Sequence, residues 1–288
     1  MVINKLKDER LKSIVFLIIA SILASTGGFL IKLVDWNPIA ISGVRSFIGS
    51  ITILLYLRKI KINVTKVHIG GSIAYAGTVI LFVVANKLTT SANVILLQYT
   101  SPIFVALLGI WILNEKIFLY DWVTIFCVLG GMALFFIDGI ETGNMLGNVL
   151  SIFSGFSFAC VTIAFRLQKD GSPVETALLG NIITFLIAIP FIFKETPSFK
   201  SIAVLIILGV LQTGLCIILY ALAMKHITAM EAVLINVIEP LLNPLWTFLI
   251  VGEKPSFYSV IGGIIVILSV SLRGIFVAKK QKSDKEFF

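Results

Sequence analysis

The polar residues with the clearest potential for chemistry lie in one long apolar stretch, residues 228–251. Asn236, Glu239 and Asn243 are spaced i, i+3 and i+7, so a helix would present all three on one face. A carboxylate in the middle of a membrane-length apolar stretch is costly unless it faces a cavity, has a partner or binds a proton. Glu239 therefore has two interpretations: a contact for a substrate amine or a coupling proton, or a structural carboxylate that joins helices.

Two other charged residues in apolar surroundings extend these possibilities. Arg45 could hold a substrate carboxylate; alternatively it could neutralise Glu239, or run along its own helix toward the membrane surface. Glu231 lies on the same stretch as Glu239 and is a further candidate for a coupling or structural charge. The functional and the structural interpretations of these charges stay open at this point.

Weaker polar faces lie on other apolar stretches. Gln212 and Tyr220 share a predicted helix face, and Tyr75 shares another with Thr78 and Phe82. Aromatic walls suit an apolar side chain or a cation, whereas serine and threonine in membrane helices often join helices instead of binding a ligand. We expect the substrate contacts to come from Glu239, Asn236, Asn243, Gln98, Tyr99, Tyr75, Gln212, Tyr220, Trp246 and Ser25.

Three prolines within apolar stretches are expected to act as hinges. A proline in a helix removes the hydrogen bond to the carbonyl four residues back. Pro102 and Pro240 would thereby free the carbonyls of Gln98 and Asn236, and Pro244 would free a third. Such carbonyls are tolerated in lipid only beside protein, water or a cavity. The prolines therefore predict a central polar cavity, with a static bend for packing as the alternative.

The two proline segments belong to an internal duplication. Pro102 and Pro240 are 138 residues apart, and Glu115 and Glu253 are separated by the same distance. A fixed register over several segments indicates a repeated unit. The copies differ at the position before the proline, where Ser101 in the first copy corresponds to Glu239 in the second.

The composition predicts an all-α membrane protein. Hydrophobic residues make up 58% of the chain and charged residues 13%, against about 25% charged in soluble domains. Ten apolar stretches approach the roughly 20 residues that span a bilayer as a helix. The first follows a basic segment and could be taken for a signal peptide, but its length favours a retained span. The stretches are 13–31, 37–57, 67–86, 88–114, 117–138, 142–165, 174–193, 201–224, 227–251 and 255–272.

The charge distribution predicts the topology. With the N-terminus inside, 17 of the 23 Lys and Arg residues fall on the cytoplasmic side and five on the other, so both termini are expected in the cytoplasm. The net charge of +8 therefore reflects topology and gives no reason to expect a nucleic-acid partner. We divide the chain into repeats 1–140 and 141–278 and a charged cytoplasmic tail, 279–288, expected to be disordered.

The repeats must be inverted, because each contains five predicted spans. Inverted repeats are the usual architecture of secondary transporters, with the substrate site near the membrane midplane. Enzymatic chemistry has little support: His68 and His226 lack partners at metal or triad spacing, and no glycine-rich phosphate loop follows a strand. We expect no cofactor, no metal and no catalytic residue.

The same motifs also resemble a known family. They are Pro38 and Arg45 in the second stretch, Pro102 to Glu115 in the first copy, Glu239-Pro240 and Gly252-Glu253-Lys254 in the second copy, and Gly262-Gly263 in the last stretch. Over nearly its whole length the chain resembles two EamA domains of the drug/metabolite transporter superfamily. This resemblance implies a ten-helix carrier of small metabolites, most often an exporter of amino acids or related compounds.

The expected function is therefore secondary transport. We expect a plasma-membrane exporter that works by alternating access, driven by an ion gradient or by the substrate's own gradient, with proton exchange at Glu239 as a hypothesis. The alternatives are an importer of a small nutrient or organic cation, and an intramembrane enzyme. Beyond the bilayer and the small-molecule substrate, the expected assembly is a monomer or a homodimer.

Overall fold

The structure, a computed structural model, describes residues 2–58, 65–135, 137, 144–242 and 256–286, and the regular secondary structure in these ranges is helical, without a strand. Eight helical stretches are long and apolar enough to cross a membrane, and Leu119–Phe135 is a shorter apolar helix. The predicted stretch 227–251 continues beyond the described residues. The eight stretches are Asp8–Lys32, Pro38–Leu57, Lys66–Leu88, Ser91–Leu113, Met145–Leu167, Pro173–Ile192, Phe199–Ala223 and Phe257–Val277.

The helices follow one another with short connections. The first half contains α1 (Val2–Ala24), α2 (Gly27–Lys32), α3 (Pro38–Leu57), α4 (Lys66–Leu88), α5 (Ser91–Gln98), α6 (Ser101–Leu108), the π-helix η1 (Gly109–Leu113) and α7 (Leu119–Phe135). The second half contains α8 (Met145–Leu167), α9 (Pro173–Ile192), α10 (Phe199–Leu208), the π-helix η3 (Gly209–Cys216), α11 (Ile217–Ala223), α12 (Ala229–Ile235) and α14 (Phe257–Glu286).

Corresponding helices in the two halves begin in the same way. Thr90 precedes α5 and accepts a hydrogen bond from the Asn93 amide, while Thr228 precedes α12 and accepts one from the Glu231 amide. A threonine at this position satisfies one of the amides that the first helical turn leaves unpaired. Thr90 and Thr228 are 138 residues apart, so the local start signal is duplicated along with the sequence.

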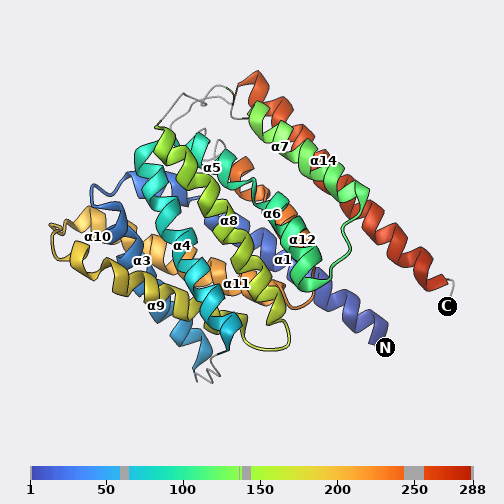
Figure 1. Cartoon of the computed structure of the whole chain (residues 1–288), viewed down its shortest axis with the longest axis horizontal. Helices are drawn as coiled ribbons and strands as arrows, with labels where there is room; N and C mark the ends of the chain where they lie inside the picture. Colours follow the sequence, from blue (N-terminus) through green and yellow to red (C-terminus); the bar gives the residue numbers. More distant parts are fainter. Residues whose placement is uncertain (1, 59–64, 136, 138–143, 243–255, 287–288) are drawn as a thin grey trace.

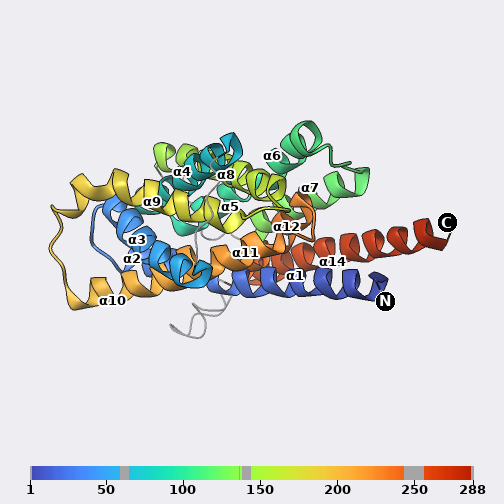
Figure 2. The ribbon, with the colours of Figure 1, turned by 90° about the horizontal axis from the view of Figure 1, so that it is seen from below.

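The helices pack into a bundle in which α7 and α14 run side by side along one edge (Figure 1). Elsewhere α4 packs against α8 and α9, α3 packs against α9 and η3, and α1 packs against α11. Small residues permit these close crossings: a Cβ on Gly71 of α4 would lie 2.7 Å from Ala164 and 2.8 Å from Thr176. The start of α1 and the end of α14 lie at the same end of the bundle (Figure 2).

Three spans are interrupted partway along their length. The first breaks between α1 and α2 at Ser25-Thr26, the fourth between α5 and α6 at Tyr99-Thr100, and the ninth after α12 at Asn236-Val237, with helix resuming over residues 238–242. The latter two breaks lie just before Pro102 and Pro240. The prolines therefore interrupt helices at equivalent positions in both halves.

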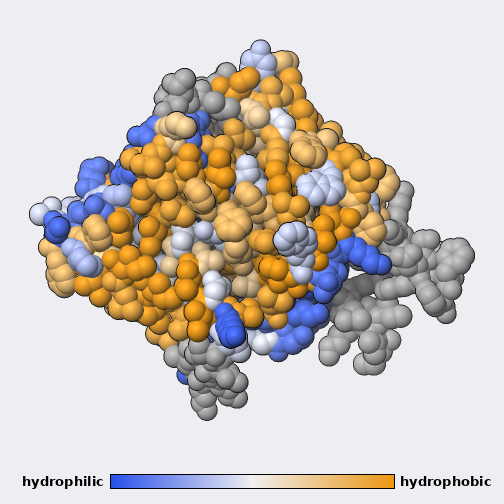
Figure 3. Space-filling model, viewed as in Figure 1, coloured by the Kyte–Doolittle hydropathy of each residue, from blue (hydrophilic) through white to orange (hydrophobic). Residues whose placement is uncertain are grey.

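The surface is apolar, as lipid contact requires. Large hydrophobic side chains such as Trp111, Leu119 and Phe199 are exposed, and the face shown in Figure 3 is mostly hydrophobic. A soluble monomer seldom exposes so continuous an apolar surface. One expectation fails at the C-terminus: α14 continues as a helix through Glu286, in place of the disordered tail predicted for residues 279–288. Its length carries helical hydrogen bonding into the charged segment.

Candidate functional site

A cavity of about 140 Å³ lies where the middle portions of α3, α4, α8 and η3 meet the breaks of the fourth and ninth spans. Polar side chains from both halves of the chain reach it. It thus lies where a substrate site between two repeats was expected. The predicted residues that line it are Glu239, Asn236, Gln98, Tyr99, Tyr75, Gln212, Tyr220 and Arg45.

Glu239 is the centre of a hydrogen-bond network that joins three spans. Its Oε2 accepts hydrogen bonds from the Tyr99 hydroxyl and from Asn236 Nδ2, each at 3.1 Å. Asn236 Oδ1 in turn accepts one from Ser21 Oγ of α1 at 3.0 Å. The carboxylate therefore links the broken fourth and ninth spans, and the amide of Asn236 extends the link to the first.

The Tyr99 hydroxyl can serve either protonation state of Glu239. It has one hydrogen and two acceptors within reach: the Asn236 main-chain oxygen at 2.7 Å and Glu239 Oε2 at 3.1 Å. With an ionised Glu239, Tyr99 donates to the carboxylate; with a protonated Glu239, the acid donates to Tyr99, which then donates to the carbonyl. Adding a proton to Glu239 thus reverses one hydrogen bond without leaving a group unpaired.

The carbonyl freed by Pro240 is part of this network. Pro240 is buried, and the Asn236 carbonyl four residues earlier accepts from the Glu239 amide at 2.9 Å as well as from the Tyr99 hydroxyl. The partner that satisfies the broken helix therefore comes from the other half of the chain. The Asn236 carbonyl therefore meets the Tyr99 hydroxyl at the cavity, and the role of Pro240 as a hinge stays a prediction.

The equivalent carbonyl in the first half, that of Gln98, has a different environment. Pro102 is buried, and the Gln98 carbonyl faces Gly155 of α8, where an added Cβ would lie 2.6 Å from the oxygen. The Gln98 side chain donates from Nε2 to Ser154 Oγ at 2.9 Å, which fixes it against α8. The fourth span is therefore anchored by close packing at the point where the ninth span is anchored by the hydrogen bonds of Tyr99.

Arg45 does not pair with Glu239, which overturns one of the predicted structural roles. Its guanidinium is 4% exposed and Nη1 donates to Gln212 Oε1 at 3.1 Å, while no carboxylate of the described residues lies within ion-pair distance. Gln212 Nε2 donates onward to the Ala24 carbonyl, at 2.7 Å, at the break of the first span. A buried arginine thus faces the cavity with a neutral amide as its partner.

The π-helix η3 holds α3 at this position. Thr213 Oγ1 donates to the Arg45 main-chain oxygen at 2.7 Å, and the Thr213 carbonyl accepts from Asn181 Nδ2 at 3.0 Å. A π-helix leaves backbone groups available for such tertiary contacts and frequently marks a functional region. The wide turn therefore positions both Gln212 and the backbone that carries Arg45.

Aromatic rings form much of the remaining wall. Tyr75, Tyr99 and Tyr220 are each at most 5% exposed, and the Tyr220 hydroxyl lies 2.9 Å from Thr162 Oγ1. The ring centroids of Phe158 and Tyr220 are 5.5 Å apart. The cavity thus combines two charged groups with rings that suit an apolar substituent or a cation.

One predicted substrate contact, Ser25, and one predicted coupling or structural charge, Glu231, lie outside the cavity. Ser25 is buried at the break of the first span, and its Oγ donates to the Ile22 carbonyl at 2.7 Å, so it serves the helix and does not line the cavity. Glu231 forms an ion pair with Arg10 at 2.6 Å because it lies in the first turn of α12 and not at the depth of Glu239. Asn243, Pro244 and Trp246 lie outside the described residues.

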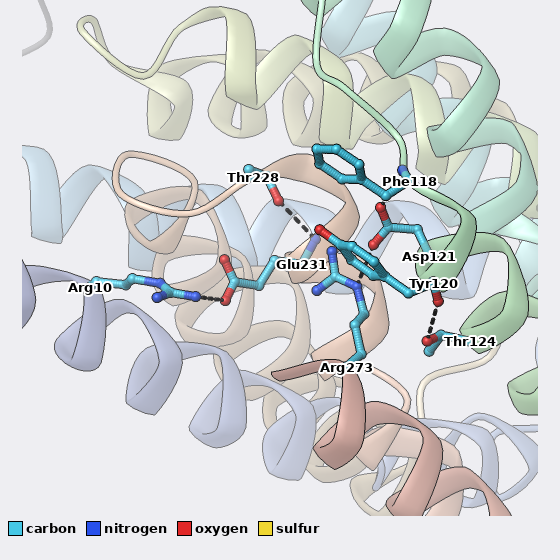
Figure 4. Close-up of polar contacts among 8 residues, drawn as sticks. All are labelled: Arg10, Phe118, Tyr120, Asp121, Thr124, Thr228, Glu231 and Arg273. Atoms are coloured by element: carbon cyan, nitrogen blue, oxygen red, sulfur yellow. Dashed lines mark hydrogen bonds and ion pairs between the residues drawn. The ribbon is translucent and has the colours of Figure 1, made fainter. Parts of the chain in front are cut away.

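A second charged region, the terminal-end cluster, lies near α7, α12 and α14 (Figure 4). Arg273 Nε of α14 lies 2.7 Å from Asp121 Oδ1 of α7, and Arg10 of α1 pairs with Glu231. The pairs border a cavity of about 360 Å³. In this cluster each arginine meets a carboxylate from a different helix, which fastens helices together.

Some residues that line the cavity cannot be identified from the sequence pattern. Phe158 and Val161 of α8 lie in an apolar stretch where nothing distinguishes a cavity face from a lipid face. Thr213 also lines the cavity, and its role depends on the π-helix, which shifts side chains off the 3.6-residue period. A search for polar side chains at helical spacing therefore finds the charged and amide groups but misses the apolar wall.

Comparisons with known proteins find similar sequences over most of the chain. The model of the EamA-like transporter family matches residues 11–137 and again 145–274. The uncharacterized transporter YoaV of Bacillus subtilis is 21% identical over 264 residues, covering 86% of this chain and 90% of that protein. A protein named S-adenosylmethionine uptake transporter from Rickettsia prowazekii is 26% identical over 202 residues, covering 68% of this chain and 66% of that protein.

A solved crystal structure has the same fold. It superposes with a TM-score of 0.79 at 16% sequence identity, covering 93% of this chain and 98% of the other. At this identity the likeness concerns the arrangement of the helices alone. It extends over both halves of the chain.

Proposed function

Since this chain belongs to the EamA-like transporter family of the drug/metabolite transporter superfamily and is a multi-pass membrane protein, we propose that it exports amino acids or related small metabolites across the cytoplasmic membrane. The observation that carries the proposal is the central cavity, in which Glu239 meets Tyr99 and Asn236 at two proline-broken spans. Such a site provides charge recognition at the place where the helices bend.

The helix contacts support alternating access by two inverted five-helix repeats, 1–140 and 141–278. With ten spans, a two-fold axis would exchange the third span with the eighth, the first with the sixth and the second with the seventh. The packing of α4 on α8 is accordingly matched by that of α11 on α1, and α4 on α9 by η3 on α3. Equivalent contacts on both sides let the same rocking motion open either face.

The hydrogen bonds of Glu239 support a proposed role in proton coupling. The hydroxyl of Tyr99 can form a hydrogen bond with both the ionised and the protonated acid. Glu239 can therefore bind and release a proton without leaving a buried polar group unpaired. A substrate amine would compete with that proton for the carboxylate. Exchange of one for the other would let a proton gradient drive export.

Import is the second candidate. Two relatives from Rickettsia species are named S-adenosylmethionine uptake transporters, at 26% identity each. The orientation that we propose, with both termini cytoplasmic in the plasma membrane, is compatible with either direction. A monomer or homodimer acting on a small solute, with no nucleic acid and no catalytic step, completes the proposal.

Counterflow in proteoliposomes tests the proposal. Wild-type protein is expected to exchange labelled amino acids saturably and to accumulate them when a pH gradient is imposed. Glu239→Gln is expected to lose the response to pH, because an amide cannot carry the proton, and to retain only weakened exchange, because the substrate amine loses its carboxylate partner. Asp170→Asn, at an exposed position away from the cavity, is the matched control and should behave as wild type.

Two results would contradict parts of the proposal. Uphill transport by Glu239→Gln that still follows the pH gradient would remove Glu239 as the coupling site. Absence of saturable exchange for every amino acid would remove the substrate class. Labelled-solute flux in right-side-out and inverted vesicles then separates export from uptake, and S-adenosylmethionine belongs in the same panel.

A further inference from the structure

Arg45 is a buried arginine that forms no ion pair with a carboxylate of the described residues. Arg45 is 4% exposed and lines the central cavity, and among the described residues its guanidinium has one partner, the neutral amide oxygen of Gln212, which accepts from Nη1. Nε is closed to solvent and donates to no acceptor of the described residues. Water therefore does not replace the missing partner at Nε, and one edge of the guanidinium is left without an acceptor.

Such a group is costly unless something compensates it. Burying a charge without a partner opposes folding by several kcal/mol, and membrane helices retain such charges where they serve a substrate or an ion. By contrast, Arg273 is 8% exposed and faces Asp121 at 2.7 Å. Among the described residues, one buried arginine thus has a carboxylate partner and the arginine in the cavity has none.

The carboxylate already in the cavity does not fill this role. Glu239 is held by Tyr99 and Asn236 and makes no ion pair with Arg45. The cavity therefore contains one positive and one negative group that are not joined to each other. A ligand with one charge of each sign can satisfy both, whereas a simple amine leaves Arg45 unpaired.

We propose that Arg45 receives the carboxylate of a zwitterionic substrate whose amino group is received by Glu239. The inference rests on the proposed transport function and deepens it, because it assigns the recognition of the carboxylate to one residue. An arginine presents N–H groups that match the oxygens of a carboxylate, and with Nε closed to solvent the nitrogen left for a ligand in the cavity is Nη2. Nη1, on the other side of the fork, is the atom occupied by Gln212.

Gln212 is the positioning residue for this anion site. It holds Nη1 of Arg45 through Oε1 and the Ala24 carbonyl through Nε2, so it ties the guanidinium to the break of the first span. Gly27 makes room for it: a Cβ there would collide with the Gln212 amide, while a Cβ on the adjacent Gly28 would meet its nearest atom, on Ser91, at 3.9 Å. The two glycines thus provide a matched pair for displacing Gln212.

The experiment compares molecules that differ by one carboxylate. Inhibition constants against labelled amino-acid counterflow are measured for L-leucine and 3-methylbutylamine, and for L-phenylalanine and 2-phenylethylamine. Wild type is expected to bind each amino acid at least about tenfold more tightly than its amine, because a charge-assisted contact is lost. In Arg45→Gln the ratio is expected to fall to about twofold or less.

Further variants keep the test informative if Arg45→Gln does not fold. Gly27→Ala displaces Gln212 and is expected to reduce the ratio to about threefold, whereas Gly28→Ala keeps it near tenfold. Gln212→Glu places a fixed carboxylate against Arg45 and is expected to remove the preference for the amino acid. Assays in methanesulfonate, which has no carboxylate, are run beside assays in chloride, so that a bound chloride ion is distinguished from the substrate's own carboxylate.

The experiment distinguishes failure of the proposed transport function from failure of the proposed role of Arg45. Wild-type protein that carries no amino acid overturns the proposed function. Protein that carries amino acids but binds amine and amino acid equally, or an Arg45→Gln variant that keeps the tenfold ratio, overturns only the role of Arg45. Transport that requires chloride assigns Arg45 to an inorganic ion and also overturns the inference, while an unchanged ratio in methanesulfonate supports it.

Discussion

The central cavity and the terminal-end cluster both contain arginines and carboxylates, but they arrange them in opposite ways. In the cluster Arg273 meets Asp121 at 2.7 Å and Arg10 meets Glu231 at 2.6 Å, each pair joining two helices. In the cavity Arg45 and Glu239 line the same space, yet each is bonded to neutral groups. In the terminal-end cluster, opposite charges therefore form ion pairs that hold helices together. In the central cavity, where a solute would bind, the opposite charges are kept apart.

The difference separates two uses of charge in an apolar bundle. A buried pair satisfies itself and contributes little beyond fixing which helices meet, whereas removing one partner is strongly destabilising. Charges held apart by Tyr99, Asn236 and Gln212 remain available to a third group. Substitutions in the two regions should consequently change different measurements: thermal stability at the cluster and transport at the cavity.

The largest effect is expected from breaking the most buried pair. Asp121→Ala leaves Arg273 without its carboxylate at a position 8% exposed, and should lower the free energy of unfolding by about 3–5 kcal/mol. The measurement is the midpoint of thermal unfolding in detergent. Replacing both partners, Asp121→Leu with Arg273→Met, should recover most of the loss, while Glu239→Gln should leave the midpoint near that of wild type. Equal destabilisation by Glu239→Gln would erase the contrast between the regions.

A smaller effect is expected inside the cavity. Tyr99→Phe removes the hydroxyl shared by Glu239 and the Asn236 carbonyl, and should slow proton-driven transport about tenfold, equivalent to one or two hydrogen bonds. Tyr220→Phe is the matched variant, because the Tyr220 hydroxyl contacts Thr162 and neither Glu239 nor Asn236. It should change the rate by about twofold or less. Comparable losses in both would indicate that the rings, and not the hydroxyl network, determine the rate.

The smallest effect is expected at the more exposed pair of the cluster. The side chains of Arg10 and Glu231 are 27% and 12% exposed, so Glu231→Gln should cost at most about 1 kcal/mol of stability. The difference from wild type should shrink further in high salt, which screens exposed charges. Unfolding midpoints at low and high ionic strength test this. If the loss of stability in Glu231→Gln persists at high salt, the ion pair of Glu231, like that of Asp121, would be one that strongly stabilises the bundle.

The convergence of Gln98, Tyr99, Asn236 and Glu239 could be predicted from the sequence. Helix breaks follow from the chemistry of proline, and the repeat places the two breaks at equivalent positions. The effect of proline on a helix and the duplication therefore predict the same central cavity. The apolar spans could be predicted for a similar reason, because hydrophobicity over about 20 residues is a local property of the chain. None of these inferences depends on the conformation of a particular side chain.

The partner of Arg45 could not be predicted in this way. A long side chain reaches several neighbours, and the choice of Gln212 over Glu239 depends on the π-helix at Gly209–Cys216, which helical periodicity does not reveal. Glu231 was assigned to the same group of charges as Glu239 because the sequence does not show where along the helix the membrane core begins. Its position in the first turn of α12 places it with Arg10 instead.

The break in the ninth span has a consequence for drugs and inhibitors. The Asn236 carbonyl and the carboxylate of Glu239 lie at the proposed solute site and also take part in the hydrogen bonds that stabilise the bent helix. A molecule that bonds to them too well would hold that bend in one conformation, and a ligand shifts an equilibrium only through its unequal affinity for the two states. Blockers of this protein should therefore be found among tight-binding analogues of its cargo, and the best cargo should be a moderate binder.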